Sequence, residues 1–151
     1  MQRHKWILGI LLLAILATAG CTVSSTQAPA ASSQSPNSTE PPLGGGSKQI
    51  GTYTVTLFSS PNPPIRGSNV LQALVVDASN QPVKDAAVSF DIDMTTMSHG
   101  KNVVAARLTN NGRYAATLAF AMPGPWRVIV GIQRAGQPPV SDRFNFSVNL
   151  R

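Results

Sequence analysis

Short segments in which apolar and polar residues alternate, separated by Pro, Gly and Asn, dominate the chain after Gln49. Successive side chains of a β-strand point to opposite faces, so this period of two predicts half-buried strands. Several short strands with regularly spaced turn signals are typical of a sandwich. The segments cover residues 52–58, 70–78, 86–94, 101–109, 113–121, 125–133 and 143–150. The sequence therefore predicts an all-β domain, an immunoglobulin-like antiparallel β-sandwich of about seven strands.

The apolar positions of these segments define the expected core. The chain has one cysteine, so no internal disulfide is available and apolar packing alone has to hold the domain. One buried aliphatic or aromatic side chain contributes about 1.5–3 kcal/mol. The expected inward residues are Tyr53, Val55, Leu57, Val88, Phe90, Ile92, Met94, Tyr114, Ala116, Leu118, Phe120, Phe144, Phe146 and Val148.

Residues 1–20 have the features of a secretory signal. Arg3, His4 and Lys5 precede an apolar run over residues 6–16, and small residues follow it. The run is shorter than the ~20 residues that span a bilayer comfortably. Export would place the protein outside the cytoplasm.

Cys21 directly follows Ala19 and Gly20, a context that resembles the lipobox of bacterial lipoproteins. Thr18 departs from that pattern, which usually has Leu three residues before the cysteine. The alternative is a plain secretory signal that leaves a free thiol, a liability in an oxidising compartment. We expect a lipidated Cys21 that anchors the protein to a bacterial membrane.

Residues 21–48 are rich in Ser, Pro, Ala and Gly and have almost no large apolar side chain. Such a segment cannot offset its ordering entropy by burial. It is predicted to be a flexible tether, followed by the sandwich domain over residues 49–151. Cleavage before Cys21 leaves ten basic and six acidic residues, which are scattered. Export and the lack of a basic run argue against a nucleic-acid partner.

An enzymatic function has little support in the sequence. Neither G-x-S-x-G nor H-E-x-x-H occurs, and His99 is the one histidine that follows the signal segment. Asp91 and Asp93 stand two residues apart on the face of their strand expected to point outward. We interpret that pair as a solvated face, so the prediction is a protein without catalytic activity.

Met94, Met97 and His99 lie within DMTTMSHG, at the end of a predicted strand and in the loop after it. Thioether sulfur is a soft, neutral ligand that suits Cu(I), and imidazole suits both copper oxidation states. Loops at the end of a sandwich commonly carry binding functions. Met122 in AMPGPW joins the set if its turn closes the same end. The candidate cofactor is a copper ion, with Cu(I) favoured.

Each of these residues also has a structural interpretation. Met94 continues the inward face of its strand, where a methionine fills a core gap, and Met122 is equally ambiguous. Met97 and His99 sit in a polar loop that gives a methionine no apolar environment. Trp126 is expected to be a core anchor, with a cation–π contact to a bound Cu(I) as the alternative.

The chain resembles the YtkA-like domain family, which is related to FixH-like proteins, over residues 51–148. The resemblance rests on GTYTVTLFSSPNPPIRGSN, VVDASNQPVKDAAVSFDIDMTTMSHG and NNGRYAATLAFAMPGPWRVIVGI. In the family the third strand runs into an M-P-x-M-x-H-like segment. Met94, Met97 and His99 match it, and Thr95 replaces its proline. The resemblance implies metal handling beside a membrane oxidase-assembly or metal-efflux partner.

Two functional hypotheses follow for the predicted domain. The first is a membrane-tethered extracytoplasmic module that binds copper reversibly through Met97 and His99, with Met94 and Met122 as further candidate ligands. The second is a metal-free structural or protein-interaction module of the cell envelope. A structure that places the Met97 sulfur and the His99 imidazole nitrogen far apart, with Met94 fully buried, would favour the second.

Overall fold

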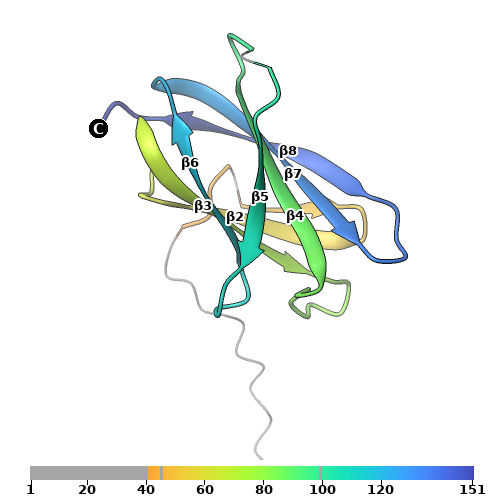
Figure 1. Ribbon diagram of the computed structural model, residues 1–151. Coiled ribbons are helices and arrows are strands. Elements are labelled where there is room, and N and C mark those ends of the chain that lie inside the picture. Colours follow the sequence, from red (N-terminus) through yellow and green to blue (C-terminus); the bar gives the residue numbers. More distant parts are fainter. Residues whose placement is uncertain (1–40, 45, 99) are drawn as a thin grey trace, which may run out of the picture. The chain divides into compact units, whose positions relative to one another are not determined.

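Eight β-strands run through the part of the chain that the computed structural model describes, residues 41–44, 46–98 and 100–151 (Figure 1). These residues carry no helix, and they include none long and apolar enough for a membrane crossing. The all-β prediction is confirmed. The strands are β1 (Ser47–Ile50), β2 (Tyr53–Ser60), β3 (Gly67–Val76), β4 (Ala86–Met94), β5 (Val103–Leu108), β6 (Tyr114–Phe120), β7 (Gly124–Arg134) and β8 (Val140–Val148).

The strands follow the order β1-β2-β3-β6-β5-β4-β7-β8, and every neighbouring pair is antiparallel. β5 pairs with β4 through Val103 to Ala106 and with β6 through Arg107 and Leu108. It therefore passes from one layer to the other and joins them. β1, β2, β3 and β6 form the first layer, and β4, β7 and β8 form the second, which crosses it in Figure 1. This is the expected antiparallel sandwich.

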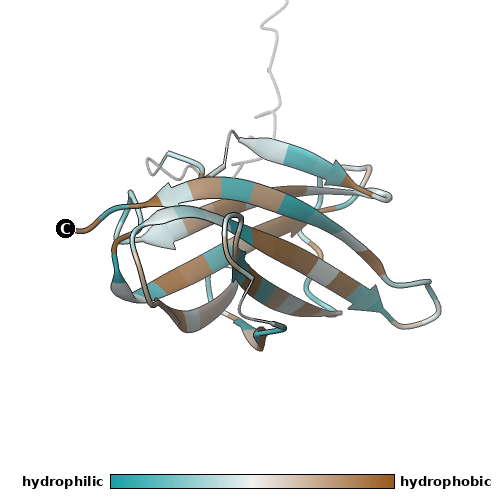
Figure 2. Ribbon diagram, turned by 90° about the horizontal axis from the view of Figure 1, so that it is seen from above, coloured by the Kyte–Doolittle hydropathy of each residue, from teal (hydrophilic) through white to brown (hydrophobic). Residues whose placement is uncertain are grey.

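The core lies between these layers and contains the residues that the alternation predicts. Val55, Leu57 and Phe90 are fully buried, and the inward residues of β4 and β6 are buried with them. Phe146 alone among the predicted set is only half-buried, although it packs against the same cluster. Brown and teal bands alternate along the strands in Figure 2, as the period of two requires.

The folded domain begins earlier than Gln49, the boundary expected from composition. β1 starts at Ser47, and Leu43 is buried, with its backbone N–H donating to the Leu57 carbonyl at 2.7 Å. The Pro41 carbonyl accepts a bond from Asn62 Nδ2 at 2.7 Å. The strand count rises from about seven to eight because β1 has one buried residue, Ile50, and so shows no alternation. The signal segment, Cys21 and most of the expected tether lie outside the described residues.

The first and last strands of the sheet approach each other along a polar seam. Lys48 Nζ of β1 donates to the Arg143 carbonyl and forms an ion pair with Asp142 Oδ2, both at 2.8 Å. Outside the two strands, Arg66 N–H, just before β3, donates to the carbonyl of Asn149, just after β8, at 2.8 Å. The bond from Lys48 occupies a carbonyl of the edge strand β8 that would otherwise be open to pairing with another chain.

Candidate functional site

The candidate ligands of the described chain gather at one end of the sandwich. Met94 is the last residue of β4 and stands opposite Trp126 of β7. The Thr95 N–H and hydroxyl both donate to the Pro125 carbonyl, at 3.1 and 3.3 Å. The β4–β5 loop then projects from this end in Figure 1, near the turn that carries Met122. Met122 lies at this same end, because its carbonyl accepts a bond from Trp126, which stands opposite Met94. This is the condition under which the sequence adds Met122 to the candidate ligands.

The three described methionines occupy different environments. Met94 is 6% exposed and belongs to the core, and its Cε lies 3.5 Å from the position that a Cβ on Gly124 would take. Met97 is 53% exposed. Met122 is half-buried against the core. The burial of Met94 matches its packing interpretation, whereas Met97 has the access that a reversible metal ligand needs.

His99 lies outside the described residues. How its imidazole is placed relative to the Met97 sulfur therefore stays a prediction. The described residues contain no group of three His, Cys, Asp or Glu side chains able to hold a metal ion.

Trp126 is a core anchor in this arrangement. It is 4% exposed, and its ring meets Phe120 edge to face at a centroid distance of 5.0 Å. Its Nε1–H donates to the Met122 carbonyl at 2.9 Å. Since indole N–H groups need a partner when buried, this bond fixes the backbone at Met122 against the core.

Asp93 corrects the sequence-based interpretation of a solvated face. It is 7% exposed, and its Oδ2 accepts bonds from Arg127 Nη2 at 2.9 Å and from the Ser98 hydroxyl at 2.7 Å. Alternation places it on the outer face as expected, but β7 sets Arg127 directly opposite and the loop folds back over it. A buried carboxylate requires such partners. Ser98, five residues after Asp93, is the one local feature that indicates a partner for the carboxylate. Arg127 lies on another strand, and no local pattern identifies it as the second partner.

A polar hollow of about 270 Å³ lies beside the loop on the outer face of β4 and β7. Its lining includes Asp91, Asp93, Lys101 and Arg127, with Ser98 at the loop. Asp91 is half-buried, and its Oδ1 accepts a bond from the Asn102 N–H at 3.0 Å. The two carboxylates thus both bond to the loop, Asp93 at Ser98 and Asp91 at Asn102.

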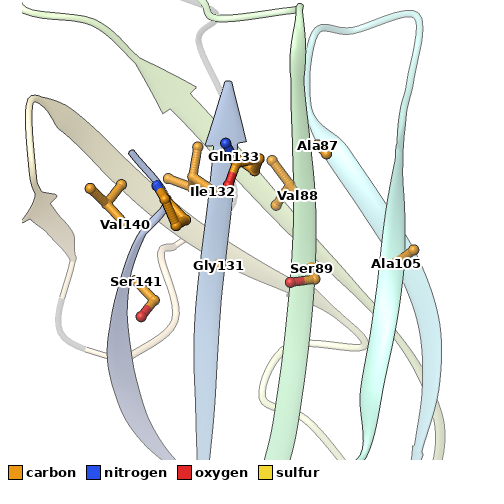
Figure 3. A pocket seen from close by; sticks show the side chains of 10 residues that line it. Ala87, Val88, Ser89, Ala105, Gly131, Ile132, Gln133, Val140 and Ser141 are labelled. Carbon is orange, nitrogen blue, oxygen red and sulfur yellow. The ribbon is translucent and has the colours of Figure 1, made fainter. Parts of the chain in front are cut away.

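A second, mostly apolar groove of about 400 Å³ crosses the outer face of the same layer, towards the other end of β4 (Figure 3). Small side chains give it its depth, namely Ala87, Ser89, Ala105 and Ser141 around Gly131. None of its lining residues is titratable or a metal ligand. It is separate from the methionine loop.

Solved structures share this fold at low sequence identity. FetP from uropathogenic Escherichia coli strain F11 matches with a TM-score of 0.55 and 12% identity, over 73% of this chain and 96% of that one. A copper-bound variant of FetP matches with a TM-score of 0.55 and 14% identity, over 74% and 94% of the two chains. A DUF4426 family protein from Pseudomonas aeruginosa PAO1 gives 0.50 and 13%, over 70% and 97%. These likenesses establish the fold.

Sequence comparison identifies the family. No curated protein sequence matches the chain. The model of the YtkA-like family matches residues 47–131, which include the six strands from β1 to β6, most of β7 and the whole methionine loop. This match covers more than half of the chain, and the chain therefore belongs to the YtkA-like family.

Proposed function

We propose that the protein is an extracytoplasmic, membrane-tethered module that binds copper reversibly, with Met97 and His99 as its principal ligands. The exposed Met97 carries this proposal, because a side chain that is 53% exposed in a polar loop contributes little to packing. Its thioether needs no deprotonation to bind Cu(I). Met122, half-buried at the same end, is the best placed second sulfur. Copper is cargo in this proposal, moved by ligand exchange without catalysis.

The copper-bound FetP variant supports the proposal in a limited way. It shows that a sandwich of this fold binds copper in another protein, and it leaves the ligands to be argued from this chain. Here the described part offers soft sulfur donors and no cluster of hard carboxylate ligands. That donor chemistry favours Cu(I) over Ca²⁺ or Mg²⁺, which prefer oxygen.

A metal-free interaction module is the alternative, and two observations favour it. Met94 is buried in the core, which leaves fewer accessible sulfurs than the DMTTMSHG pattern suggested. The apolar groove around Gly131 is lined by small side chains, which leave space for a side chain of a partner protein (Figure 3).

Copper binding is tested by titrating the full chain, kept in detergent, with Cu(I) against a competing chelator. The protein carries Cys21→Ser, because a thiolate would bind Cu(I) and mask the loop. We expect one copper ion per chain. Binding should weaken at least about 10-fold in Met97→Leu combined with His99→Ala. His4→Ala, which removes the other histidine of the chain, should leave it unchanged.

Two results would reject copper binding at the loop. One is a concentration of the chelator–copper complex that the parent Cys21→Ser protein does not lower. The other is a Met97→Leu, His99→Ala protein that competes as well as the parent. In either case the interaction module becomes the working hypothesis, and the groove around Gly131 is the first surface to mutate.

The membrane tether belongs to the same proposal. A lipidated Cys21 would hold the domain near a membrane partner, for which an oxidase-assembly or metal-efflux protein is the class expected from the family resemblance. In an exporting bacterium we expect the wild-type chain in the membrane fraction and Cys21→Ser in the soluble fraction. Recovery of both in the soluble fraction would show that the signal is a plain secretory one.

A further inference from the structure

Asp93 fastens the loop that carries Met97. The carboxylate is buried at the end of β4, and it receives bonds from two directions outside its own strand. Arg127 Nη2 of β7 donates to Oδ2 at 2.9 Å, and the Ser98 hydroxyl donates to the same atom at 2.7 Å. Oδ1 accepts the Met94 N–H at 2.9 Å. One side chain thus ties the start of the loop, its middle and the neighbouring strand together.

Met97 is held between two attachment points. On one side, Thr95 bonds to the Pro125 carbonyl through its N–H at 3.1 Å. On the other side, Ser98, the residue directly after Met97, bonds to Asp93 at 2.7 Å. Only Thr96 and Met97 lie between them. The Met97 side chain is therefore exposed while the backbone on both sides of it is fixed to the sheet.

Fixing the backbone matters for a weak, neutral ligand. A flexible loop loses conformational entropy when a metal orders it, and that loss lowers the affinity. Bonds that involve a charged partner are stronger than neutral ones, and burial reduces their screening by salt. The bonds around Asp93 combine both properties. Groups that orient a metal ligand without touching the metal commonly change affinity by about 10–100-fold.

We propose that Asp93 is a positioning residue for the copper ligand Met97, acting through Ser98 and anchored by Arg127. The inference rests on the proposed copper function. It also makes a claim about the metal-free protein, in which the Ser98 bond should already restrain the loop. Asp93 is not itself a ligand here, because its Oδ2 is occupied by Arg127 and Ser98 and its Oδ1 by Met94 N–H.

Ser98→Ala is the main test, since it removes the hydroxyl and leaves the buried ion pair. Two measurements are made on the full chain with Cys21→Ser in detergent. The first is hydrogen–deuterium exchange of the β4–β5 loop without metal, and the second is Cu(I) affinity against a chelator. We expect faster exchange at Met97 and Ser98 and about 10-fold weaker copper binding. Ser98→Thr keeps a hydroxyl and should restore both.

Thr96→Ala is the matched control, because it removes a hydroxyl from an exposed position of the same loop. It should change neither measurement. Asp93→Asn is a second variant that keeps the shape of the side chain and removes its charge. It should weaken copper binding at least as much as Ser98→Ala. If Asp93→Asn does not fold, the comparison of Ser98→Ala with Ser98→Thr still tests the positioning role.

The outcomes separate this inference from the proposed function. Unchanged exchange and unchanged affinity in Ser98→Ala, with copper bound by the parent, would overturn the positioning role alone. Equal losses in Ser98→Ala and Thr96→Ala would also overturn it, because the effect would not depend on Asp93. No copper binding by the parent would overturn the copper function and, with it, the role of Asp93 toward a ligand.

Discussion

Met94 and Met97 lie three positions apart in the sequence and in opposite environments. Met94 is 6% exposed and packs in the core, whereas Met97 is 53% exposed in the loop. Leu has nearly the volume of Met and lacks its sulfur, so the same substitution separates packing from ligation at both positions. Because the two side chains differ in exposure, we expect the substitution to have different effects at the two positions.

Met94→Leu should change the free energy of unfolding by less than about 1.5 kcal/mol, since volume-conserving core changes are well tolerated. It should leave the Cu(I) affinity close to that of the parent. Met97→Leu should leave stability within about 0.5 kcal/mol, as an exposed position does, and lower the affinity at least about 10-fold. Urea unfolding and chelator competition measure the two effects. A folded Met94→Leu protein that no longer binds copper would make Met94 a ligand.

Single residues also show what the sequence could and could not predict about the site. The burial of Phe90 and Ile92 and the exposure of Met97 follow from alternation and from loop composition, which are local properties. The role of Asp93 does not, because it depends on β7 lying beside β4 in this register. Strand order is a long-range property. The alternating pattern of β4 shows which of its faces is buried, but it does not show which strand lies beside it.

The turn between β1 and β2 leaves little room for a side chain at Gly51. Gly51 has φ +61°, and a Cβ there would lie 2.9 Å from Val140 Cγ1 of β8. Gly136, in the β7–β8 connection, has φ +74° with nothing within 4 Å of its Cβ position. The two glycines thus share the left-handed backbone and differ in the contact.

Gly136→Ala should cost about 1 kcal/mol of unfolding free energy, since a left-handed residue other than glycine is strained by roughly 1–2 kcal/mol. Gly51→Ala should cost clearly more, because Val140 must also move. Thermal and urea unfolding of the two variants measure the difference. Equal losses of unfolding free energy in the two variants would mean that Val140 moves away at little cost and that β1 and β8 are weakly packed against each other.

The ion pair between β1 and β8 makes this seam sensitive to acid. The Lys48 ammonium, followed by the Arg143 N–H, lowers the pKa of the Asp142 carboxyl from its usual value. A carboxyl whose folded-state pKa is lowered stabilises the fold above its unfolded-state pKa of about 3.9, and this stabilisation is lost as the pH falls through the folded-state value. The pair is exposed, so its contribution is small.

Asp142→Asn should therefore be less stable than the wild type at pH 7, with the difference shrinking below about pH 4. Unfolding in urea across this range measures it. Lys48→Met removes the main cause of the lowered pKa and should reduce the acid-dependent part of the wild-type stability. A difference between Asp142→Asn and wild type that stays constant down to about pH 2 would contradict this account.

For the molecule as a whole, the domain boundary expected from composition differs from the boundary that the packing contacts show. The alternating strands that predict a sandwich are long and apolar, and seven of the eight were found for that reason. Leu43 and β1 were missed because they stand among Pro, Gly and Ser, and their burial depends on β2 and not on their own pattern. A chain that starts at Gly51 removes these residues and keeps every strand that alternation predicts.

The shorter chain should be less stable than one that starts at Pro41. Leu43 and Ile50 are 6% and 2% exposed, and each buried side chain of this size contributes about 1.5–3 kcal/mol. The loss of β1 also leaves β2 as an open edge strand, so we expect a greater tendency to aggregate. A chain that starts at Ser35 is the control and should match the Pro41 chain in urea unfolding. Equal stability of all three chains would restrict the folded core to β2–β8 and make β1 an edge addition.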